Sequence, residues 1–204
     1  MLDGSSMIVG GVMVYTIILG IIIGITYKKH KKVDWLKQLF KFFFALYICM
    51  VISVTLFPLA LWIDFDLERF KYSMNLIPFI AIVKDINQVG VAYDGDSLFM
   101  IKLIIRNVGG NIVMFIPLGI LLPIVSEKIK TFKHVLLGGV TFSLIIECFQ
   151  CVETLLGGFG RTVDIDDVLL NTVGTIIGFL IYKVASTIAK RIKGAISVNG
   201  ISSP

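Results

Sequence analysis

The sequence predicts an all-α integral membrane protein, built as a five-helix transmembrane bundle. Its composition leads to this fold class: 56% of the 204 residues are hydrophobic, only 16% are charged, and the mean hydropathy is +0.91. Soluble domains average about 45 to 50% apolar and about 25% charged residues. This composition excludes a disordered chain, a secreted disulfide scaffold and a soluble nucleic-acid-binding protein.

Five apolar segments are long enough to cross the hydrocarbon core of a bilayer, which takes about 20 helical residues. Each segment has few charged residues or none in its interior. The expected spans cover residues 7–26, 42–63, 107–125, 135–156 and 168–189. Residues 1–189 would then form a single transmembrane domain, and residues 190–204 a cytoplasmic tail. Within this tail, the polar residues 194–204, which include Gly and Ser, are expected to be loose.

One further apolar segment, Leu76 to Val83, has only eight residues and is too short to cross. We expect it to pack at the membrane interface or to re-enter the membrane after the second span. The following residues, Asp85 to Lys102, would fold as a loop over the outer end of the bundle.

The distribution of charge predicts the orientation of the bundle, because Lys and Arg gather in short cytoplasmic loops. Residues 28–41 include six basic residues and one acid, and residues 126–134 include three lysines. Both loops should lie inside, which places the N-terminus outside and, after five spans, the C-terminus inside. Residues 1–6 have no Lys or Arg, unlike the start of a signal peptide, so we expect the first span to be a retained anchor.

Polar side chains occur within these spans, where an ionisable or amide group is costly unless it is paired or faces a cavity. The fourth span contains Glu147 and Gln150, which lie three residues apart and therefore on one helix face. At about 1.5 Å of rise per residue, Glu147 lies about 18 Å from the inner edge, just past the midplane. This places both side chains in the outer half of the membrane.

The third and fifth spans bring polar groups to the same depth. The approach to the fifth span has polar and small residues at steps of three, four, three and four: Asp164, Asp167, Asn171, Gly174 and Gly178. Three polar residues lie near the outer end of the third span: Arg106, Asn107 and Asn111. This convergence predicts one ligand-binding site made of Arg106, Asn107, Asn111, Glu147, Gln150, Arg161, Asp164, Asp167 and Asn171.

Helix packing is the competing explanation for these polar residues. Glu147 could pair with Arg161 or Arg106, and Asn111 and Asn171 could form interhelical hydrogen bonds of about 0.6 kcal/mol each. Packing alone, however, needs neither two carboxylates nor an arginine at one depth. The glycines of these spans are expected to serve close helix packing: Gly109, Gly110, Gly119, Gly174 and Gly178.

We predict no metal site and no cofactor. Cys148 and Cys151 have CxxC spacing, but they lie within a span and no second pair accompanies them, so we interpret them as packing residues. His30 and His134 fall in the inside loops, away from the polar residues, which argues against a Ser-His-Asp arrangement and a zinc site. Carboxylates could hold a hard cation such as Mg²⁺, but nothing in their spacing demands one.

At these residues the chain resembles the VanZ-like family of bacterial membrane proteins, also known as the teicoplanin-resistance protein family. The motifs are NLIPF at 75–79, RNVGGNIVMFIPLG at 106–119, ExxQ at 147–150 and RxxDxxDxxxNxxGxxxG at 161–178. The resemblance implies a multi-pass protein of the bacterial cell membrane. Its founding member is associated with low-level resistance to teicoplanin-type lipoglycopeptides.

Two functions fit the polar residues. A binding or shielding protein would hold a phosphate, carboxylate or sugar head group with Arg106 and Arg161, because guanidinium forms bidentate bonds to such anions. Its partner would be a membrane lipid, a lipid-linked cell-wall precursor or a lipoglycopeptide, and not a nucleic acid. The oligomeric state is left open.

The alternative is a membrane-embedded hydrolase or transferase acting on a lipid-linked cell-envelope substrate. Glu147 would be its general acid or base, and Asp164 or Asp167 its nucleophile or cation ligand. A proton-coupled transporter that uses Glu147 as a relay is less favoured, because five spans without a visible repeat do not suggest alternating access.

Overall fold

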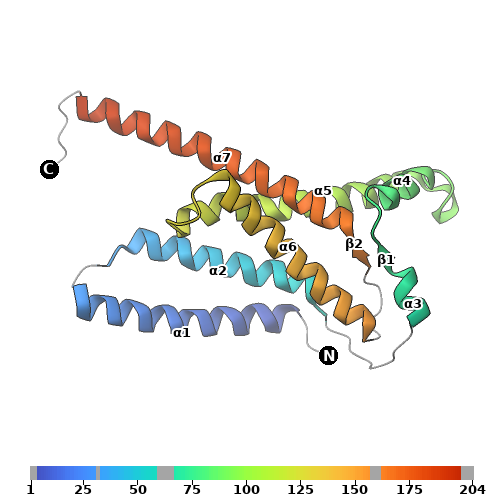
Figure 1. Ribbon diagram of the computed structural model, residues 1–204, viewed down its shortest axis with the longest axis horizontal. Helices are drawn as coiled ribbons and strands as arrows, with labels where there is room; N and C mark the ends of the chain where they lie inside the picture. The colour runs from blue at the N-terminus through green and yellow to red at the C-terminus, as the bar shows by residue number, and fades with distance from the viewer. Residues whose placement is uncertain (1–3, 31–32, 59–66, 157–161, 199–204) are drawn as a thin grey trace.

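The computed structural model describes residues 4–30, 33–58, 67–156 and 162–198. Seven α-helices, one short 3-10 helix and two short strands occur in these residues (Figure 1). They are α1 (Gly4–His30), α2 (Trp35–Leu56), α3 (Leu67–Tyr72), β1 (Met74–Asn75), α4 (Ile80–Asn87), η1 (Tyr93–Gly95), α5 (Ser97–Val125), α6 (Phe132–Leu155), β2 (Val163–Asp164) and α7 (Ile165–Val198).

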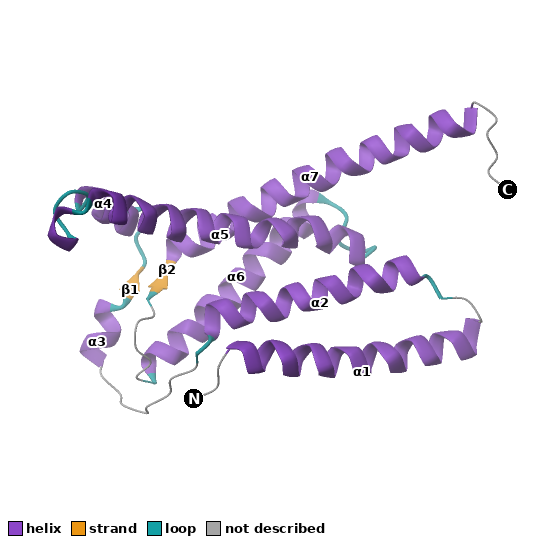
Figure 2. Ribbon diagram, turned by 180° about the vertical axis from the view of Figure 1, so that it is seen from behind, coloured by secondary structure: helices purple, strands orange, loops and turns teal. Residues whose placement is uncertain are grey.

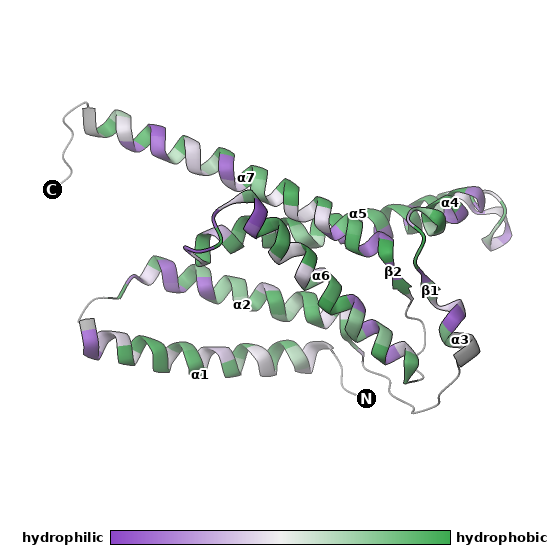
Figure 3. Cartoon of the chain, in the orientation of Figure 1, coloured by the Kyte–Doolittle hydropathy of each residue, from purple (hydrophilic) through white to green (hydrophobic). Residues whose placement is uncertain are grey.

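Five of the helices, α1, α2, α5, α6 and α7, are long and apolar enough to cross a membrane. This confirms the predicted all-α bundle of five long helices. Figure 3 shows hydrophobic residues along these helices, with hydrophilic residues in the connection between α5 and α6. The described residues contain no strands beyond β1 and β2, each two residues long.

Several helix ends differ from the prediction. α5 begins at Ser97, ten residues before the predicted start, because Lys102 and Arg106 interrupt the apolar run without interrupting the helix. The Asp96 side chain caps this start by accepting a hydrogen bond from the backbone N–H of Phe99 at 2.9 Å. The region predicted as a loop at residues 85–102 therefore contains the end of α4, η1 and the first turns of α5.

The predictions for α2 and α7 also need correction. α2 begins at Trp35, where the Asp34 side chain accepts from Lys37 N at 3.0 Å, and it ends at Leu56, just before Pro58. The last five residues of the predicted span, 59–63, lie outside the described residues. α7 continues to Val198, so residues 194–198 are helical and not part of the loose tail that their polarity suggested.

The closest helix packing is between α5 and α7. A Cβ atom on Gly119 would overlap the backbone of Thr175, and a Cβ on Gly178 would overlap the backbone carbonyl of Ile116. Gly174 packs equally closely on α5, which confirms the packing role predicted for these three glycines. Gly109 and Gly110 have open space instead, so the packing prediction for them was wrong.

A small core joins α2, α5 and α6 and contains Val51, Phe115, Leu118 and Ile146. α1 packs on α2, where the Ser53 hydroxyl donates to the carbonyl of Gly4 at 2.9 Å, and most of its surface is exposed. The helices α2, α5, α6 and α7 therefore form the body of the molecule.

α2 and α6 end, and α5 and α7 begin, at the same end of the bundle, together with β1, β2 and α4 (Figures 1 and 2). We call this the β end. The two strands pair in parallel, with Met74 opposite Val163 and Asn75 opposite Asp164. The predicted interfacial segment lies here: residues 76–79 form a turn and α4 begins at Ile80.

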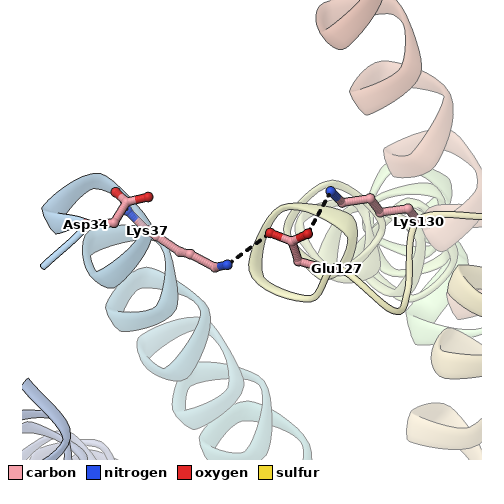
Figure 4. A network of polar contacts seen from close by, with 4 residues as sticks. All are labelled: Asp34, Lys37, Glu127 and Lys130. Carbon is pink, nitrogen blue, oxygen red and sulfur yellow. Dashed lines mark hydrogen bonds and ion pairs between the residues drawn. The ribbon is translucent and has the colours of Figure 1, made fainter. Parts of the chain in front are cut away.

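An ionic cluster connects α2 to the loop between α5 and α6 at the opposite end. The Glu127 carboxylate lies 3.1 Å from Lys37 Nζ and 3.7 Å from Lys130 Nζ (Figure 4). The hydrogen bond from Lys37 and the charges of both lysines hold the pKa of Glu127 below its usual value. Because the cluster is exposed, it contributes little to stability.

Candidate functional site

A cavity of about 880 Å³ lies at the β end, bounded by residues of α2, α4, α5, α6 and α7. Eight of the nine predicted site residues line it: Arg106, Asn107, Asn111, Glu147, Gln150, Asp164, Asp167 and Asn171. The ninth, Arg161, lies outside the described residues. Residues from three predicted spans thus border one cavity.

Glu147 lies on the buried face of α6 and is 6% exposed. This face also contains Ser143 and Gln150, at the i−4 and i+3 positions of the helix. The Oε2 atom of Glu147 accepts a hydrogen bond from the backbone N–H of Asp164 at 3.0 Å. Glu147 therefore links α6 to β2, directly before the start of α7.

The Asp164 carboxyl group is held from two sides. Its Oδ1 atom accepts hydrogen bonds from Asn75 Nδ2 and from the backbone N–H of Asp166, both at 2.8 Å. The second bond caps the start of α7. Burial raises the pKa of Asp164 above its usual value, the two hydrogen bonds lower it, and the carboxylates of Asp166 and Asp85 raise it again.

Asp166 also lines the cavity, although the sequence analysis did not select it. It is 2% exposed, and its Oδ1 atom accepts from the backbone N–H of Phe79 at 2.6 Å. Phe79 has a left-handed backbone, with φ of 65°. Asp166 was missed because it lies off the helical stripe of Asp164 and Asp167; the only signal for it was the acidic run at 164–167.

Amide side chains connect the helices around the cavity. Asn111 of α5 donates to the Asp167 carboxylate of α7. Asn171 Nδ2 donates to Ser143 Oγ of α6 at 2.9 Å, and Gln150 Nε2 donates to the Thr55 carbonyl of α2 at 2.9 Å. The interhelical hydrogen bonds considered as the competing explanation are therefore present, and they surround the cavity.

Three buried oxygens at the cavity have no hydrogen-bond partner among the described residues: Gln150 Oε1, Asp166 Oδ2 and Asn171 Oδ1. Buried polar groups in proteins are normally hydrogen-bonded, so each of these oxygens calls for an explanation. The amide of Gln150 has an unambiguous orientation, because its nitrogen donates to a carbonyl. Helix packing alone does not explain why these oxygens are buried without a hydrogen-bond partner.

Arg106 lies at the rim of the cavity and is exposed. Arg106 forms no ion pair with Glu147. The ion pairs among the described residues are those of Glu127, at the opposite end of the bundle. The predicted pairing of Glu147 with Arg106 is therefore not observed, and its pairing with Arg161 lies outside the described residues. Arg106 is the last of the ten additional residues of α5 and Asn107 follows it, so the two lie in the third and fourth turns of the helix.

The wall that α2 and part of α5 form is apolar, and the sequence analysis did not predict it. Tyr47, Met50 and Val54 of α2 line the cavity together with Val113 of α5. Tyr47 donates its hydroxyl to the carbonyl of Met114 at 2.9 Å. In the sequence, these residues cannot be distinguished from ordinary apolar residues of a span.

The described residues contain no group of three or more His, Cys, Asp and Glu side chains arranged to hold a metal ion. Cys148 and Cys151 are free thiols on α6, and Cys148 is exposed. His134 contacts Thr131 at the start of α6, at the end opposite the cavity. What the site provides is therefore an acidic, acceptor-rich cavity with one apolar wall.

A model of the VanZ/LLP1 family matches residues 44–186. All the residues that line the cavity, from Tyr47 to Asn171, fall within this match, whereas α1 lies before it. Searches of curated proteins and of solved structures matched nothing.

Proposed function

We propose, from the premise that this chain belongs to the VanZ/LLP1 family, that its cavity binds an amphiphile of the cell envelope. In this proposal the protein lies in a bacterial cell membrane with its β end outward. The bound amphiphile is a membrane lipid, a lipid-linked cell-wall precursor or a lipoglycopeptide. Binding gives low-level resistance to teicoplanin-type lipoglycopeptides, because less drug reaches its target at the outer leaflet.

The observation that supports binding is the contrast between the walls of one cavity. Carboxyl and amide groups of α5, α6 and α7 form one side, and apolar residues of α2 and α5 form the other. Ligand pockets combine apolar walls with a few polar groups that orient the ligand. An amphiphile matches this division, since its head group needs polar partners and its chain needs apolar ones.

The enzyme is the second candidate, and it draws on a different observation. Three carboxyl groups from α6, β2 and α7, those of Glu147, Asp164 and Asp167, line the same cavity. In a hydrolase or transferase of a lipid-linked substrate, Glu147 would act as general acid or base. Asp164 or Asp167 would act as nucleophile or cation ligand.

The test measures teicoplanin and vancomycin susceptibility in a deletion strain that expresses wild-type protein or a variant. Asp167→Lys reverses a charge in the polar wall of the cavity, and Glu127→Lys is the matched control at the opposite end, where the side chain is exposed. We expect wild type and Glu127→Lys to protect selectively against teicoplanin, and Asp167→Lys to protect less at equal membrane abundance by blot. No protection by the wild-type protein would contradict the resistance role.

Glu147→Gln distinguishes the two candidates. The amide oxygen can still accept the Asp164 N–H, so the fold is maintained, but the side chain no longer ionises. Removal of a general acid or base costs about 10²- to 10⁴-fold in rate, so an enzyme would lose nearly all protection. A binding protein would retain much of its protection.

A further inference from the structure

The unpartnered oxygens of the cavity point to the chemistry of its ligand. Gln150 Oε1, Asp166 Oδ2 and Asn171 Oδ1 belong to residues that are 7%, 2% and 2% exposed, and all three residues line the cavity. Each of these atoms is a hydrogen-bond acceptor. The ligand that satisfies them must be a donor.

The ionisable groups around the cavity agree with this conclusion. Among the described lining residues there are five carboxyl groups, those of Asp85, Glu147, Asp164, Asp166 and Asp167, and one guanidinium, that of Arg106. Arg106 is exposed at the rim, whereas Glu147 and Asp166 are buried. Such a lining attracts a cation and disfavours a phosphate or carboxylate, which lacks hydrogens to donate.

The apolar wall shows where the remainder of the ligand lies. Met50, Val54 and Val113 line the cavity and are nevertheless 51%, 68% and 64% exposed. They lie on the α2 and α5 helices, both long and apolar enough to span a membrane, so the apolar wall of the cavity is accessible from outside the bundle on the side of these two helices. Gly110 of α5 also lines the cavity, and a Cβ atom built on it would have no atom of another element within 4 Å.

We infer that the cavity takes the protonated amine of an amphiphile, whose apolar chain leaves the bundle between α2 and α5. An ammonium group donates up to three hydrogen bonds and bears the positive charge that the carboxyl groups favour. This inference rests on the proposed function, because it names the class of amphiphile that the same cavity binds. It differs from the expectation that Arg106 and Arg161 bind an anionic head group, and the anionic probe below tests that alternative.

The test compares four dodecyl probes on the full-length protein in phosphatidylcholine nanodiscs. Dodecylamine is a donor cation, dodecyltrimethylammonium a cation without a donor, dodecyl glucoside a neutral donor, and dodecyl phosphate an anion. Binding is measured as the rise of the unfolding temperature with probe concentration. We expect dodecylamine to bind about tenfold more tightly than each of the others, because charge-assisted hydrogen bonds are the stronger ones.

Two pairs of variants locate the binding. Asp167→Asn should weaken dodecylamine binding about tenfold, whereas Glu127→Gln, the same change at the opposite end, should not weaken it. Val113→Trp should weaken binding by obstructing the opening. Ile105→Trp is its control, because Ile105 is also on α5 and also 64% exposed but does not line the cavity.

The outcomes separate this inference from the proposed function. If dodecyl phosphate or dodecyl glucoside binds as tightly as dodecylamine, the inference of an amine ligand is overturned, but the proposal of an amphiphile-binding cavity still stands. Equal effects of Val113→Trp and Ile105→Trp would overturn the path between α2 and α5, even if Asp167→Asn failed to fold. Binding of no probe at all would overturn both the inference and the proposed binding function.

Discussion

The Glu147 carboxylate of α6 accepts a hydrogen bond from the backbone N–H of Asp164, the last residue of β2, at 3.0 Å. On the same residue, the Asp164 side chain accepts from Asn75 of β1. Glu147 therefore supports the strand pair as well as lining the cavity. Its two roles can be separated by the choice of substitution.

Glu147→Ala should destabilise the protein more than Glu147→Gln. Alanine leaves the Asp164 N–H without its acceptor, which costs about 1 to 3 kcal/mol, whereas the glutamine oxygen can still accept. Thermal unfolding of the purified variants in the same nanodiscs measures this difference. Equal unfolding temperatures for the two variants would show that the hydrogen bond does not support the fold.

Gly178→Ala should destabilise the packing of α5 on α7. The new Cβ would meet the Ile116 carbonyl and the Gly119 backbone, which cannot move as a side chain can. Overpacking of this kind costs about 1 to 3 kcal/mol. Gly109→Ala is the control on α5, and it should be neutral or stabilising by about 0.5 to 1 kcal/mol, because its Cβ has open space.

Asp164 should make stability depend on pH. Because its pKa is raised in the folded protein, the folded state retains this proton at pH values where the unfolded chain has released it. The contribution of Asp164 to stability is thus complete below the usual aspartate pKa and is lost as the pH rises through the raised value. Unfolding temperatures across this window should fall less in Asp164→Asn than in wild type; parallel curves would contradict the prediction.

Asn75→Asp should weaken the strand pair, because it replaces the donor of the Asn75–Asp164 hydrogen bond with a second carboxylate. Losing this bond alone costs about 0.5 to 1.5 kcal/mol, and repulsion adds to the cost. Asn87→Asp, at the exposed end of α4, makes the same change away from the cavity. Faster amide hydrogen exchange at residues 163–166 in Asn75→Asp, but not in Asn87→Asp, is the expected result.

The predicted orientation can be tested with thiol labelling in a background without Cys49, Cys148 and Cys151. A membrane-impermeant reagent should label Val91→Cys in intact cells, because Val91 is 71% exposed at the β end. Lys128→Cys at the opposite end should react only after the cells are opened. The reverse pattern would place the cavity on the cytoplasmic side and contradict the shielding role.

The number of long helices and the meeting of polar residues at one depth could be predicted from the sequence. Successive spans run in alternating directions, and an α-helix has a constant rise per residue, so the depth of each residue in its span can be calculated. This calculation predicted similar depths for Asn111, Glu147 and Asn171. Helix ends were predicted less well. At Lys102 and Lys190, charge ends an apolar run without ending a helix.

Contacts between connections could not be predicted. The role of Asp166 depends on the Phe79 N–H, 87 positions earlier in the chain, and no local pattern indicates that these segments meet. The apolar wall at Met50 and Val113 was equally hidden, because lipid-facing and cavity-facing residues have the same composition. The sequence also could not show that the cavity has acceptors without donors, because this depends on which hydrogen-bond partner each buried oxygen has in the folded protein.

The pairing of β1 with β2 has a consequence for biosynthesis. Asn75 leaves the ribosome long before Asp164, its partner 89 positions later, so β1 has no strand to join until α5 and α6 have been made. Joining the two strands closes this long loop at an entropic cost, and packing of the helices between them lowers that cost by shortening the flexible part of the loop. A nascent chain truncated before Asp164 has the polar residues of α5 and α6 but lacks β2 and the carboxyl groups of α7, so the polar wall of the cavity is complete only after the last helix has been made.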